Sequence, residues 1–333
     1  MKKVMSIGEA LIDFIPNEKG CVLKEVVSFE RVAGGAPANV SAVVAKLGGK
    51  SNFISKLGKD AFGDYIIDVL NEVNVNTDYV LRTNKANTGI AFVSLKEDGN
   101  RDFSFYRNPS ADMLLEANEV NKEWFKHCHS LHFCSVDLID CPMKDAHKKA
   151  IEYAIENNSI ISFDPNVRLP LWDSEEACRN TILEFLPKAN IVKISDEELK
   201  FITGFDNIED AKEVLFKGNV KLVLFTKGKN GAEVYTKDRM ISIPGNTVEV
   251  VDTTGAGDSF IGAFLYSLLN DNVSVEDLSN IENKILEEYL LFSNYYAAYS
   301  TTKKGAIGSY ANLEEINEFI NNTRSIHVKK RLI

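Results

Sequence analysis

The chain has 333 residues, of which 44% are hydrophobic and 26% are charged, values typical of a soluble globular enzyme with one large α/β domain or two smaller ones. Its formal net charge of −10 at pH 7 argues against a nucleic-acid partner, which requires clustered lysine and arginine. No apolar run is long enough to cross a membrane, so no membrane association is expected either.

The N-terminus and the cysteines indicate a cytoplasmic protein. The apolar run Val4–Ile7 is followed at once by Gly8 and Glu9, which leaves no room for the core of a signal peptide. The five cysteines are odd in number and irregularly spaced, so we interpret them as reduced thiols.

The chain opens with a short β-prone stretch, Lys3–Ile7, which Gly8 ends. The apolar stretch Leu11–Ile15 follows and contains Asp13. Because a buried, unpaired carboxylate is costly, Asp13 is either a turn residue or a group that faces a cleft. This stretch alone leaves both interpretations open.

Paired glycines precede the first predicted helix. Gly34 and Gly35 lie within Ala33–Ser41, and apolar residues at helical spacing continue from this segment to Leu47. Because glycine has no Cβ, the pair leaves backbone N–H groups uncovered at the start of the helix. Asn39 is expected to project from the first helical turn.

A strand at Phe53–Leu57 and an amphipathic helix at Asp60–Val73 are predicted next. Thr88–Leu95 and Arg101–Arg107 are then β-prone and flank Glu97–Asn100, which is a strong hairpin signal. A hairpin among helical segments either stands off the main sheet as a flap or forms a plain edge, and this segment does not distinguish the two.

Strands and helices alternate regularly after residue 130, which implies a mostly parallel sheet covered by helices on both faces. Ligands bind beyond the carboxyl ends of the strands in such sheets, so polar residues there are candidate site residues. The predicted strands are Ser130–Ser135, Ser159–Asp164, Asn190–Ile194, Lys221–Thr226, Ala232–Thr236 and Met240–Ile243. The predicted helices are Met143–Glu156, Glu175–Leu186, Asp196–Thr203, Ile208–Phe216 and residues 281–300. The polar groups at strand ends are Asp164–Asn166, Lys193–Ser195, Thr226–Gly228 and Asp252–Asp258.

A second glycine motif lies between a β-prone run that ends at Val251 and a helical pattern from Phe260 to Asn270. Thr253–Gly257 is therefore predicted to turn from strand to helix, with Asp258 at the helix start. The first N–H groups of a helix lack partners within it and carry the positive end of its dipole. Such a corner binds an anion, most often phosphate.

Asp258 itself has two interpretations. It either caps the helix, or it accepts the proton of a hydroxyl that attacks a phosphoryl group while Gly255–Gly257 stabilise the developing charge. This motif alone does not decide between them.

Taken together, the two glycine motifs resemble those of the ribokinase or PfkB family of carbohydrate kinases. Gly34–Asn39, with later glycines at 48, 58 and 63, resembles the N-terminal motif of the family. Asp252–Asp258, which reads D-T-T-G-A-G-D, resembles the C-terminal motif almost without departure. The match extends from Gly8 to about Leu313.

The resemblance implies an α/β fold, a ribokinase-like three-layer sandwich with a central, mostly parallel sheet and a small β lid. It implies a domain over residues 1–315 with lid segments near 14–33 and 86–108, followed by a C-terminal helix end and basic tail at 316–333. In this family the hairpin around Asp98–Gly99 corresponds to the lid over the sugar. The resemblance also suggests a homodimer formed through the lid.

Catalytic and sugar-binding roles follow from the resemblance position by position. Asp258 matches the catalytic base, and Gly255, Ala256 and Gly257 match the anion hole. The matching sugar ligands are Asp13, Gly34, Gly35 and Asn39, which favours the cleft interpretation of Asp13.

The nucleotide and cation sites are expected in the second half of the chain. Glu198 keeps its place in the family's Asn-x-x-Glu element, which is tied to magnesium and phosphate, but Ser195 replaces the asparagine. We expect this replacement to tune magnesium binding without abolishing it. The residues expected at the nucleotide are Lys193, Ser195, Glu198, Thr226, Gly228, Gly231 and Asn294. A monovalent-cation site for K⁺ matches Asp252, Thr254, Ser300, Lys303, Gly305 and Ser309.

Two segments bear on the choice of substrate. Arg107–Asp112 and Asp164–Trp172 resemble the fructokinase branch most closely, and the second is shared in part with 2-keto-3-deoxygluconate kinases. Arg107 and Arg168 are therefore candidate substrate-binding residues. Arg168 pairs with a nucleotide phosphate, pairs with a substrate carboxylate, or only braces the loop after Asp164.

The expected function is phosphorylation of D-fructose to fructose 6-phosphate with ATP and Mg²⁺, with 2-keto-3-deoxygluconate or another sugar as the alternative substrate. A nicotinamide dehydrogenase would need G-x-G-x-x-G in the first strand-to-helix turn, where this chain has only Gly8. A non-catalytic scaffold of the same fold would be expected to lose the base or the anion hole, and the sequence keeps both.

Overall fold

The computed structural model describes residues 1–18, 20–95 and 101–330, so the tip of the predicted hairpin around Asp98 and Gly99 lies outside the described residues. Within these ranges, nine strands form one sheet in the order β13-β12-β11-β10-β9-β8-β1-β4-β5. Its strands are β1 (Lys3–Ile7), β4 (Ser51–Gly58), β5 (Val80–Thr83), β8 (Cys128–Cys134), β9 (Ile160–Asp164), β10 (Ile191–Ser195), β11 (Leu222–Thr226), β12 (Ala232–Tyr235) and β13 (Met240–Ile243).

The strands from β5 to β11 run parallel, whereas β12 is antiparallel to both of its neighbours. The central strands are buried on both faces, as expected for a parallel sheet that helices cover on both sides. Every residue of β4 and β8 is buried. The expectation of a mostly parallel central sheet is confirmed, and all seven parallel strands direct their carboxyl ends to the same edge.

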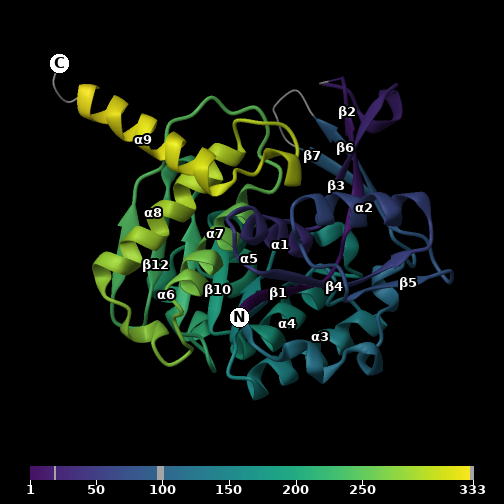
Figure 1. Ribbon diagram of the computed structural model, residues 1–333, viewed down its shortest axis with the longest axis horizontal. Helices are drawn as coiled ribbons and strands as arrows, with labels where there is room; N and C mark the ends of the chain where they lie inside the picture. The colour runs from purple at the N-terminus through teal and green to yellow at the C-terminus, as the bar shows by residue number, and fades with distance from the viewer. Residues whose placement is uncertain (19, 96–100, 331–333) are drawn as a thin grey trace.

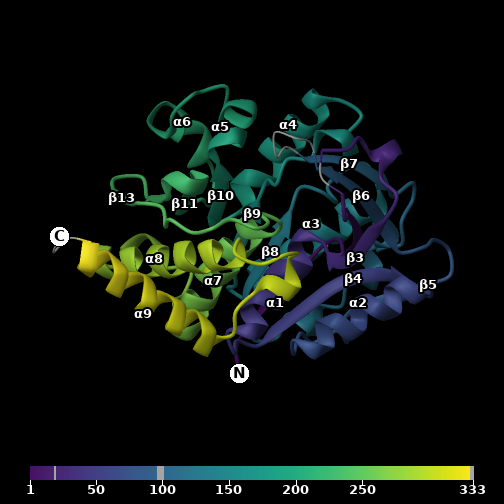
Figure 2. The same cartoon turned by 90° about the horizontal axis from the view of Figure 1, so that it is seen from above.

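Helices pack on both faces of this sheet (Figures 1 and 2). One face carries α1 (Ala36–Lys46), α2 (Ala61–Glu72), α7 (Ala256–Asn270) and α8 (Asn283–Ser300). The other carries α3 (Pro142–Glu156), α4 (Glu175–Phe185), α5 (Asp196–Thr203) and α6 (Ile208–Leu215). Local signals set several helix starts: the Asp60 side chain accepts from the N–H groups of Phe62 and Gly63 at the start of α2.

A second sheet of four strands stands beside the main one (Figure 1). It has the order β3-β2-β6-β7, with β2 (Leu11–Pro16), β3 (Phe29–Gly34), β6 (Gly89–Leu95) and β7 (Arg101–Tyr106). Aromatic rings support its inner face, where Phe14 stacks on Phe92 with ring centroids 4.9 Å apart and Phe29 and Phe62 meet them edge-on. We call this sheet the lid. The hairpin therefore stands off the main sheet and is not an edge of it.

One predicted strand does not form, and several observed strands differ from the prediction; β2, for example, was expected only as an apolar stretch. The predicted β-prone run before the second glycine motif is irregular, with Val250 57% exposed and Val251 48% exposed. Among the described residues no strand pairs with this run; instead, the N–H groups of Val251 and Asp252 donate to the Thr301 carbonyl. Strands β3 and β5 had no predicted counterpart, because neither shows a long alternating pattern.

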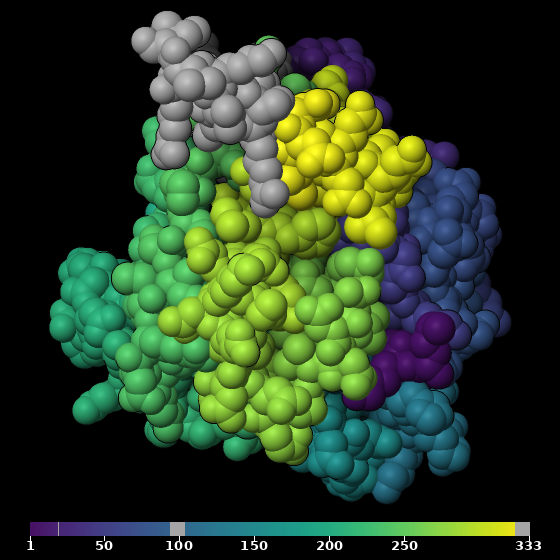
Figure 3. All heavy atoms as spheres, turned by 60° about the vertical axis from the view of Figure 1, so that its left-hand side comes forward, coloured from purple at the N-terminus to yellow at the C-terminus, as the bar shows by residue number. Residues whose placement is uncertain are grey.

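Helix α9 (Leu313–Lys330) packs on the outside of the helical layer (Figure 3). Ile316 of this helix is fully buried, and Phe319, also in the helix, meets Tyr299 edge-on with ring centroids 5.4 Å apart. The helix therefore extends well into the stretch expected to be a basic tail. In the part of the chain that the structure describes, no helix has the length and apolar character needed to cross a membrane.

Candidate active site

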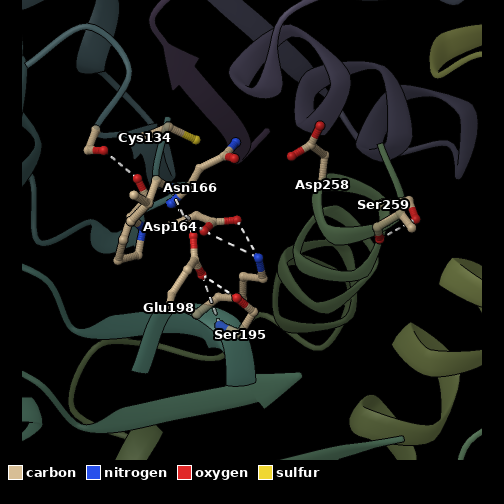
Figure 4. A network of polar contacts seen from close by, with 12 residues as sticks. Cys134, Asp164, Asn166, Ser195, Glu198, Asp258 and Ser259 are labelled. Carbon is tan, nitrogen blue, oxygen red and sulfur yellow. Dashed lines mark hydrogen bonds and ion pairs between the residues drawn. The ribbon is translucent and has the colours of Figure 1, made fainter. Parts of the chain in front are cut away.

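The polar residues collected from strand ends face the start of helix α7 across one site. Figure 4 shows Asp164, Ser195 and Glu198 on one side and Asp258, on α7, on the other. Asp164 ends β9, and Ser195 ends β10 and caps α5. Because the parallel strands end at the same edge, residues far apart in the sequence meet here.

The start of α7 is built around Gly255. This residue is the N-cap, with φ of 71° in the left-handed region, which favours glycine. A Cβ there would lie 2.2 Å from the Tyr310 hydroxyl oxygen, and this hydroxyl donates to the Gly255 carbonyl at 3.1 Å. The Ala256 N–H donates back to Thr253, whereas no contact among the described residues uses the N–H of Gly257. The corner therefore offers a backbone donor and the positive end of a helix to an anion.

Asp258 is the third residue of α7, and 9% of it is exposed. Its Oδ2 accepts a hydrogen bond from the Asn39 amide nitrogen at 2.8 Å. Burial raises the pKa of Asp258, and this hydrogen bond and the charges of Lys193 and Arg168 oppose the increase. The two glycine motifs thus meet side chain to side chain, and a buried carboxylate with a raised pKa can act as a proton acceptor beside the anion corner.

On the lid side, Asp13 lies directly against Gly34. The two residues are close neighbours on the paired strands β2 and β3, and a Cβ on Gly34 would come 2.4 Å from the Asp13 Oδ2. Gly35, with φ of 111°, then begins α1, which carries Asn39. The four residues expected to bind sugar hydroxyls, Asp13, Gly34, Gly35 and Asn39, therefore follow one another in space from the lid to Asp258.

A cavity of about 1020 Å³ opens between the lid and the segment before α7. Asp13 and Ala33 line it from the lid, and Thr253 and Thr254 line it from the opposite side. Its size matches that of small-molecule sites in proteins.

Arg107 is placed differently from the other candidate substrate residues. It is almost fully buried at the end of β7, where its guanidinium pairs with both Asp112 and Asp137. Despite burial, these two carboxylates and the charge of Glu9 hold the pKa of Arg107 above its usual value. The Glu9 carboxylate in turn accepts from the Ala36 N–H at 2.8 Å. Arg107 thus joins the end of β7 to the segments that carry Asp112 and Asp137, and its contact with a substrate stays a prediction.

The nucleotide side contains a buried ion pair and a capping box. The Lys193 ammonium lies 3.0 Å from the Asp164 Oδ2. Glu198 accepts from the Val167 N–H at 2.8 Å and from the Ser195 N–H and hydroxyl at 2.9 and 2.8 Å. Burial alone would raise the pKa of Glu198, but Lys193 and these donors outweigh it and lower the pKa. Ser195, in place of the family's asparagine, therefore holds Glu198 ionised and oriented.

The remaining nucleotide candidates are Thr226, Gly228 and Gly231, at and after the end of β11, and Asn294 on α8. Thr226 ends β11 opposite Ser195 in register. A Cβ on Gly228 would meet nothing within 4 Å, so the backbone there is open to a ligand, and Gly231 closes the same turn with φ of 97°. Asn294, on α8, donates to the Pro244 carbonyl at 3.0 Å.

The six candidate cation ligands come from two segments that the structure joins. The Asp252 Oδ2 accepts from the Gly305 N–H at 2.9 Å, and the Ser300 hydroxyl lies 3.2 Å from that of Ser259 on α7. Ser309 is fully buried nearby and donates to Ala306. The Lys303 side chain points away, to Tyr299 and Glu315, so only its backbone carbonyl can face a cation. The Thr254 hydroxyl donates to Asp252.

Magnesium fits this site only as an ion shared with a phosphate. Among the described residues, no group of three or more histidine, cysteine or acidic side chains could hold a metal alone. Asp164 supplies a buried carboxylate and Glu198 a half-buried one, and water and phosphate oxygens would have to complete an octahedral shell. This is the usual environment of Mg²⁺ at a nucleotide.

Sequence reasoning missed Tyr310, Glu9 and Asp137. Tyr310 is more than fifty residues from Gly255 in the chain, yet it packs against it. Asp137 follows β8 in a segment without a recognisable motif. A polar residue just beyond a strand end was the one signal available for Asp137, whereas no local signal marked Tyr310.

Replacing Gly255 with alanine tests the anion corner. We expect Gly255→Ala to lower kcat at least about tenfold, because a Cβ both strains a left-handed N-cap and collides with the Tyr310 hydroxyl; overpacking of this kind costs roughly 1–3 kcal/mol. The measurement is steady-state turnover together with thermal unfolding. Gly204→Ala is the matched control, since Gly204 has φ of 83° but nothing within 4 Å. If adding Tyr310→Phe to Gly255→Ala restores no turnover, the steric explanation is wrong.

Comparison with known proteins agrees with this geometry. The family model described as pfkB family carbohydrate kinase matches residues 1–312. A maize (Zea mays) protein named Fructokinase-1 is 43% identical over 318 residues, which cover 95% of this chain and 97% of that protein.

Solved structures with the same architecture include two bacterial fructokinases. The fructokinase of Xylella fastidiosa with bound ATP has a TM-score of 0.89 and 32% identity, and the match covers 96% of this chain and 98% of that one. A double mutant of the Vibrio cholerae O395 enzyme, in a form bound to fructose, ADP and potassium ion, has a TM-score of 0.84 and 31% identity, with coverage of 96% and 98%. The expected ribokinase-like fold is confirmed, and this chain belongs to the PfkB family of carbohydrate kinases.

Proposed function

We propose that the protein transfers the γ-phosphoryl group of ATP to the 6-hydroxyl of D-fructose, forming fructose 6-phosphate. The single observation that carries this proposal is the buried Asp258 carboxylate at the start of α7, hydrogen-bonded to Asn39 from the sugar-side motif. The names of the relatives support fructose as the acceptor, since the maize protein and both bacterial structures are called fructokinases.

The sugar is held between the lid and α1 in this proposal. Asp13 presents a carboxylate to sugar hydroxyls, and the bare backbone at Gly34 and Gly35 allows the sugar to approach closely. Asn39 shares its amide between the sugar and Asp258. Closure of the lid excludes water and so limits the transfer of the phosphoryl group to water.

Asp258 accepts the proton of the 6-hydroxyl while the oxygen of that hydroxyl forms a bond to the γ-phosphorus. The bond from the γ-phosphorus to the bridging oxygen breaks, and ADP leaves with the electron pair. The N–H groups at Gly255–Gly257 and the dipole of α7 stabilise the charge on the migrating group. The raised pKa of Asp258 makes the carboxylate a stronger base than an exposed aspartate.

Two cations complete the proposed site. Mg²⁺, when bound, neutralises the phosphate oxygens, and Asp164 and Glu198 are the carboxylates that would hold its water ligands. K⁺ would be bound by backbone carbonyls of the joined segments around Asp252 and Gly305, and would stabilise the turn that precedes α7.

A second substrate, 2-keto-3-deoxygluconate, is favoured by one observation. The charge of Arg168 lies close enough to Asp258 to lower the pKa of that carboxyl. A substrate carboxylate could pair with the Arg168 guanidinium. Arg107, by contrast, already pairs with two buried carboxylates. We favour fructose because the maize relative and both bacterial structures are called fructokinases.

A coupled assay of ADP release across D-fructose, D-ribose, D-glucose and 2-keto-3-deoxygluconate tests the proposal. The expected result is the highest kcat/KM with D-fructose, with the product identified as the 6-phosphate by phosphorus NMR. A higher kcat/KM with 2-keto-3-deoxygluconate would select the second substrate, and no turnover with any sugar would support a non-catalytic scaffold.

The pH dependence of kcat follows from the environment of Asp258. The carboxyl acts as a base only when deprotonated, so kcat should fall as the pH drops through its raised pKa, above the range of an ordinary aspartate. Asn39→Ala should move this limb to still higher pH, because the variant loses a hydrogen bond that favours the charged form. The measurement is a profile of kcat against pH, with Asn207→Ala, at the N-cap of α6, as control. A limb that stays in place in Asn39→Ala would contradict the assignment.

The lid has exposed apolar side chains that suit a partner, and we propose that two chains pair through it. Tyr106 at the end of β7 is 61% exposed, and Val22 and Val27, in the connection between β2 and β3, are 50% and 88% exposed. Light scattering that gives the monomer mass at micromolar concentration would contradict this dimer.

We expect the protein in the cytoplasm, where its five cysteines, all free in the structure, would stay reduced.

A further inference from the structure

The chain between α8 and α9 packs against the start of α7. We call its residues 306–311 the Tyr310 segment, and all of them except Gly308 are buried. A Cβ on Gly255 would lie 2.2 Å from the Tyr310 hydroxyl oxygen and 3.0 Å from the Ala306 Cβ. The position of Gly255, and with it the anion corner, therefore depends on where the Tyr310 segment is held.

Lys46, the last residue of α1, binds the Tyr310 segment. Its ammonium donates to the Tyr310 carbonyl at 2.6 Å and to the Ile307 carbonyl at 3.2 Å. Buried carbonyls outside regular helices and strands need donors, and here one ammonium supplies two of them. Tyr310 is thus held at both ends, because its hydroxyl donates to the Gly255 carbonyl at 3.1 Å.

A lysine in the last turn of a helix most often only complements the dipole of its own helix. Lys46 instead reaches carbonyls that lie 261 and 264 residues away in the chain. Partial burial lowers its pKa, with Glu315 opposing the decrease, so these carbonyls replace part of the water around the ammonium. A hydrogen bond from a charged donor is roughly twice as strong as one between neutral groups, so this side chain can fix the segment.

We propose that Lys46 is a positioning residue for phosphoryl transfer, because it fixes the Tyr310 segment and Tyr310 in turn fixes Gly255 and the N–H groups of the anion corner. This assignment rests on the proposed kinase function. A backbone donor stabilises the charge on the migrating phosphoryl group only while it keeps its place, and a displacement of about 1 Å can cost roughly 10²-fold in rate. Lys46 acts through Tyr310 and not by contact with the reacting groups.

The test compares Lys46→Met and Lys46→Arg with a matched control. Lys221→Met removes another partly buried lysine that donates to a loop carbonyl, that of Val275 at 2.7 Å. Lys221 precedes β11, at the edge of the sheet opposite the candidate site. All variants are assayed at saturating KCl, because the Tyr310 segment also carries Ser309, a candidate K⁺ ligand.

We expect Lys46→Met to lower kcat about 10–100-fold, with the KM for fructose within about twofold of wild type, since the sugar ligands stay in place. Lys46→Arg should keep kcat within about threefold of wild type, because a guanidinium can also donate to both carbonyls. Lys221→Met should keep the wild-type kcat.

A double-mutant cycle with Tyr310→Phe shows whether Lys46 acts through the Tyr310 hydroxyl. Tyr310→Phe removes the hydrogen bond to Gly255 and should itself lower kcat, so adding Lys46→Met to it should cost less than about threefold more. If Lys46→Met is unfolded at the assay temperature, as judged by circular dichroism, Lys46→Gln takes its place in the cycle, since it is uncharged and shorter.

Three results would overturn the proposal: a kcat of Lys46→Met within about threefold of wild type, an equal loss in Lys221→Met, or losses that multiply in the double variant. Each of them would leave the fructokinase function standing, since wild-type turnover of fructose tests that function separately.

Discussion

Asp258→Asn is expected to lower kcat by about 10²–10⁴-fold, the usual contribution of a positioned general base. This corresponds to roughly 3–5 kcal/mol of activation free energy. Asparagine keeps the size of the side chain and can still accept the Asn39 hydrogen bond through its carbonyl oxygen, but it cannot take the hydroxyl proton. Affinity for fructose should therefore change little, and turnover and sugar binding are measured separately by coupled assay and calorimetry.

The control for this variant addresses the other interpretation of Asp258, as a residue that only matches the helix dipole. Asp210 occupies the same third position in α6, remote from the site. If Asp258 acts only on its helix, Asp258→Asn and Asp210→Asn should both cost at most about 1 kcal/mol of stability and leave kcat unchanged. Wild-type turnover in Asp258→Asn would thus reject the base assignment.

Arg107→Met is expected to reduce the free energy of unfolding by about 3–5 kcal/mol, because it leaves Asp112 and Asp137 buried without their cation. Burial raises the pKa of Asp137 to about 7 even in the wild type, with Arg107 opposing the increase. A carboxyl whose pKa is higher in the folded state loses stability as the pH rises from its unfolded value toward its folded one. Without Arg107 the folded pKa rises further, so the variant should be destabilised more at pH 8 than at pH 5.

Denaturant unfolding of Arg107→Met at these two pH values measures the effect. Lys200→Met is the control, because Lys200 and Asp206 form an ion pair whose side chains are 70% and 76% exposed. Such a pair contributes about 0–1 kcal/mol, with little dependence on pH in this range. Equal destabilisation of Arg107→Met at pH 5 and pH 8 would show that loss of packing, and not an uncompensated charge, explains the cost.

The second half of the fold was predictable because its signals are local. Strands β8 to β11 and the helices between them were predicted within two residues of their observed bounds, since each combines an apolar run with a turn or cap. The lid was only half predictable. Its hairpin strands flank Glu97–Asn100, whose sequence is a strong turn signal, whereas β3 exposes Glu30 and Arg31 and is held in place by its pairing with β2.

The candidate site, like the fold, has residues that the sequence reveals and contacts that it does not. The glycine motifs and Asp258 are recognisable in the sequence because close backbone approach and a helix start impose residue types locally. The contact of Tyr310 with Gly255 and the pairing of Asp137 with Arg107 are decided by which strand ends and loops come together, which no local pattern encodes. Arg107 shows the difference most clearly: its sequence context suggests a substrate ligand, but the fold surrounds it with Asp112 and Asp137.

The sequence by itself determined the family, the order of strands and helices after the lid, and the residue types of the anion corner. Only the tertiary structure decided that the Asn39 amide contacts Asp258, that Gly255 lies against Tyr310, and that the Lys46 ammonium contacts the Tyr310 carbonyl. The physical reason is that backbone conformation and amphipathic spacing act over a few residues, whereas the charge around a buried carboxylate depends on side chains brought together from the whole length of the chain.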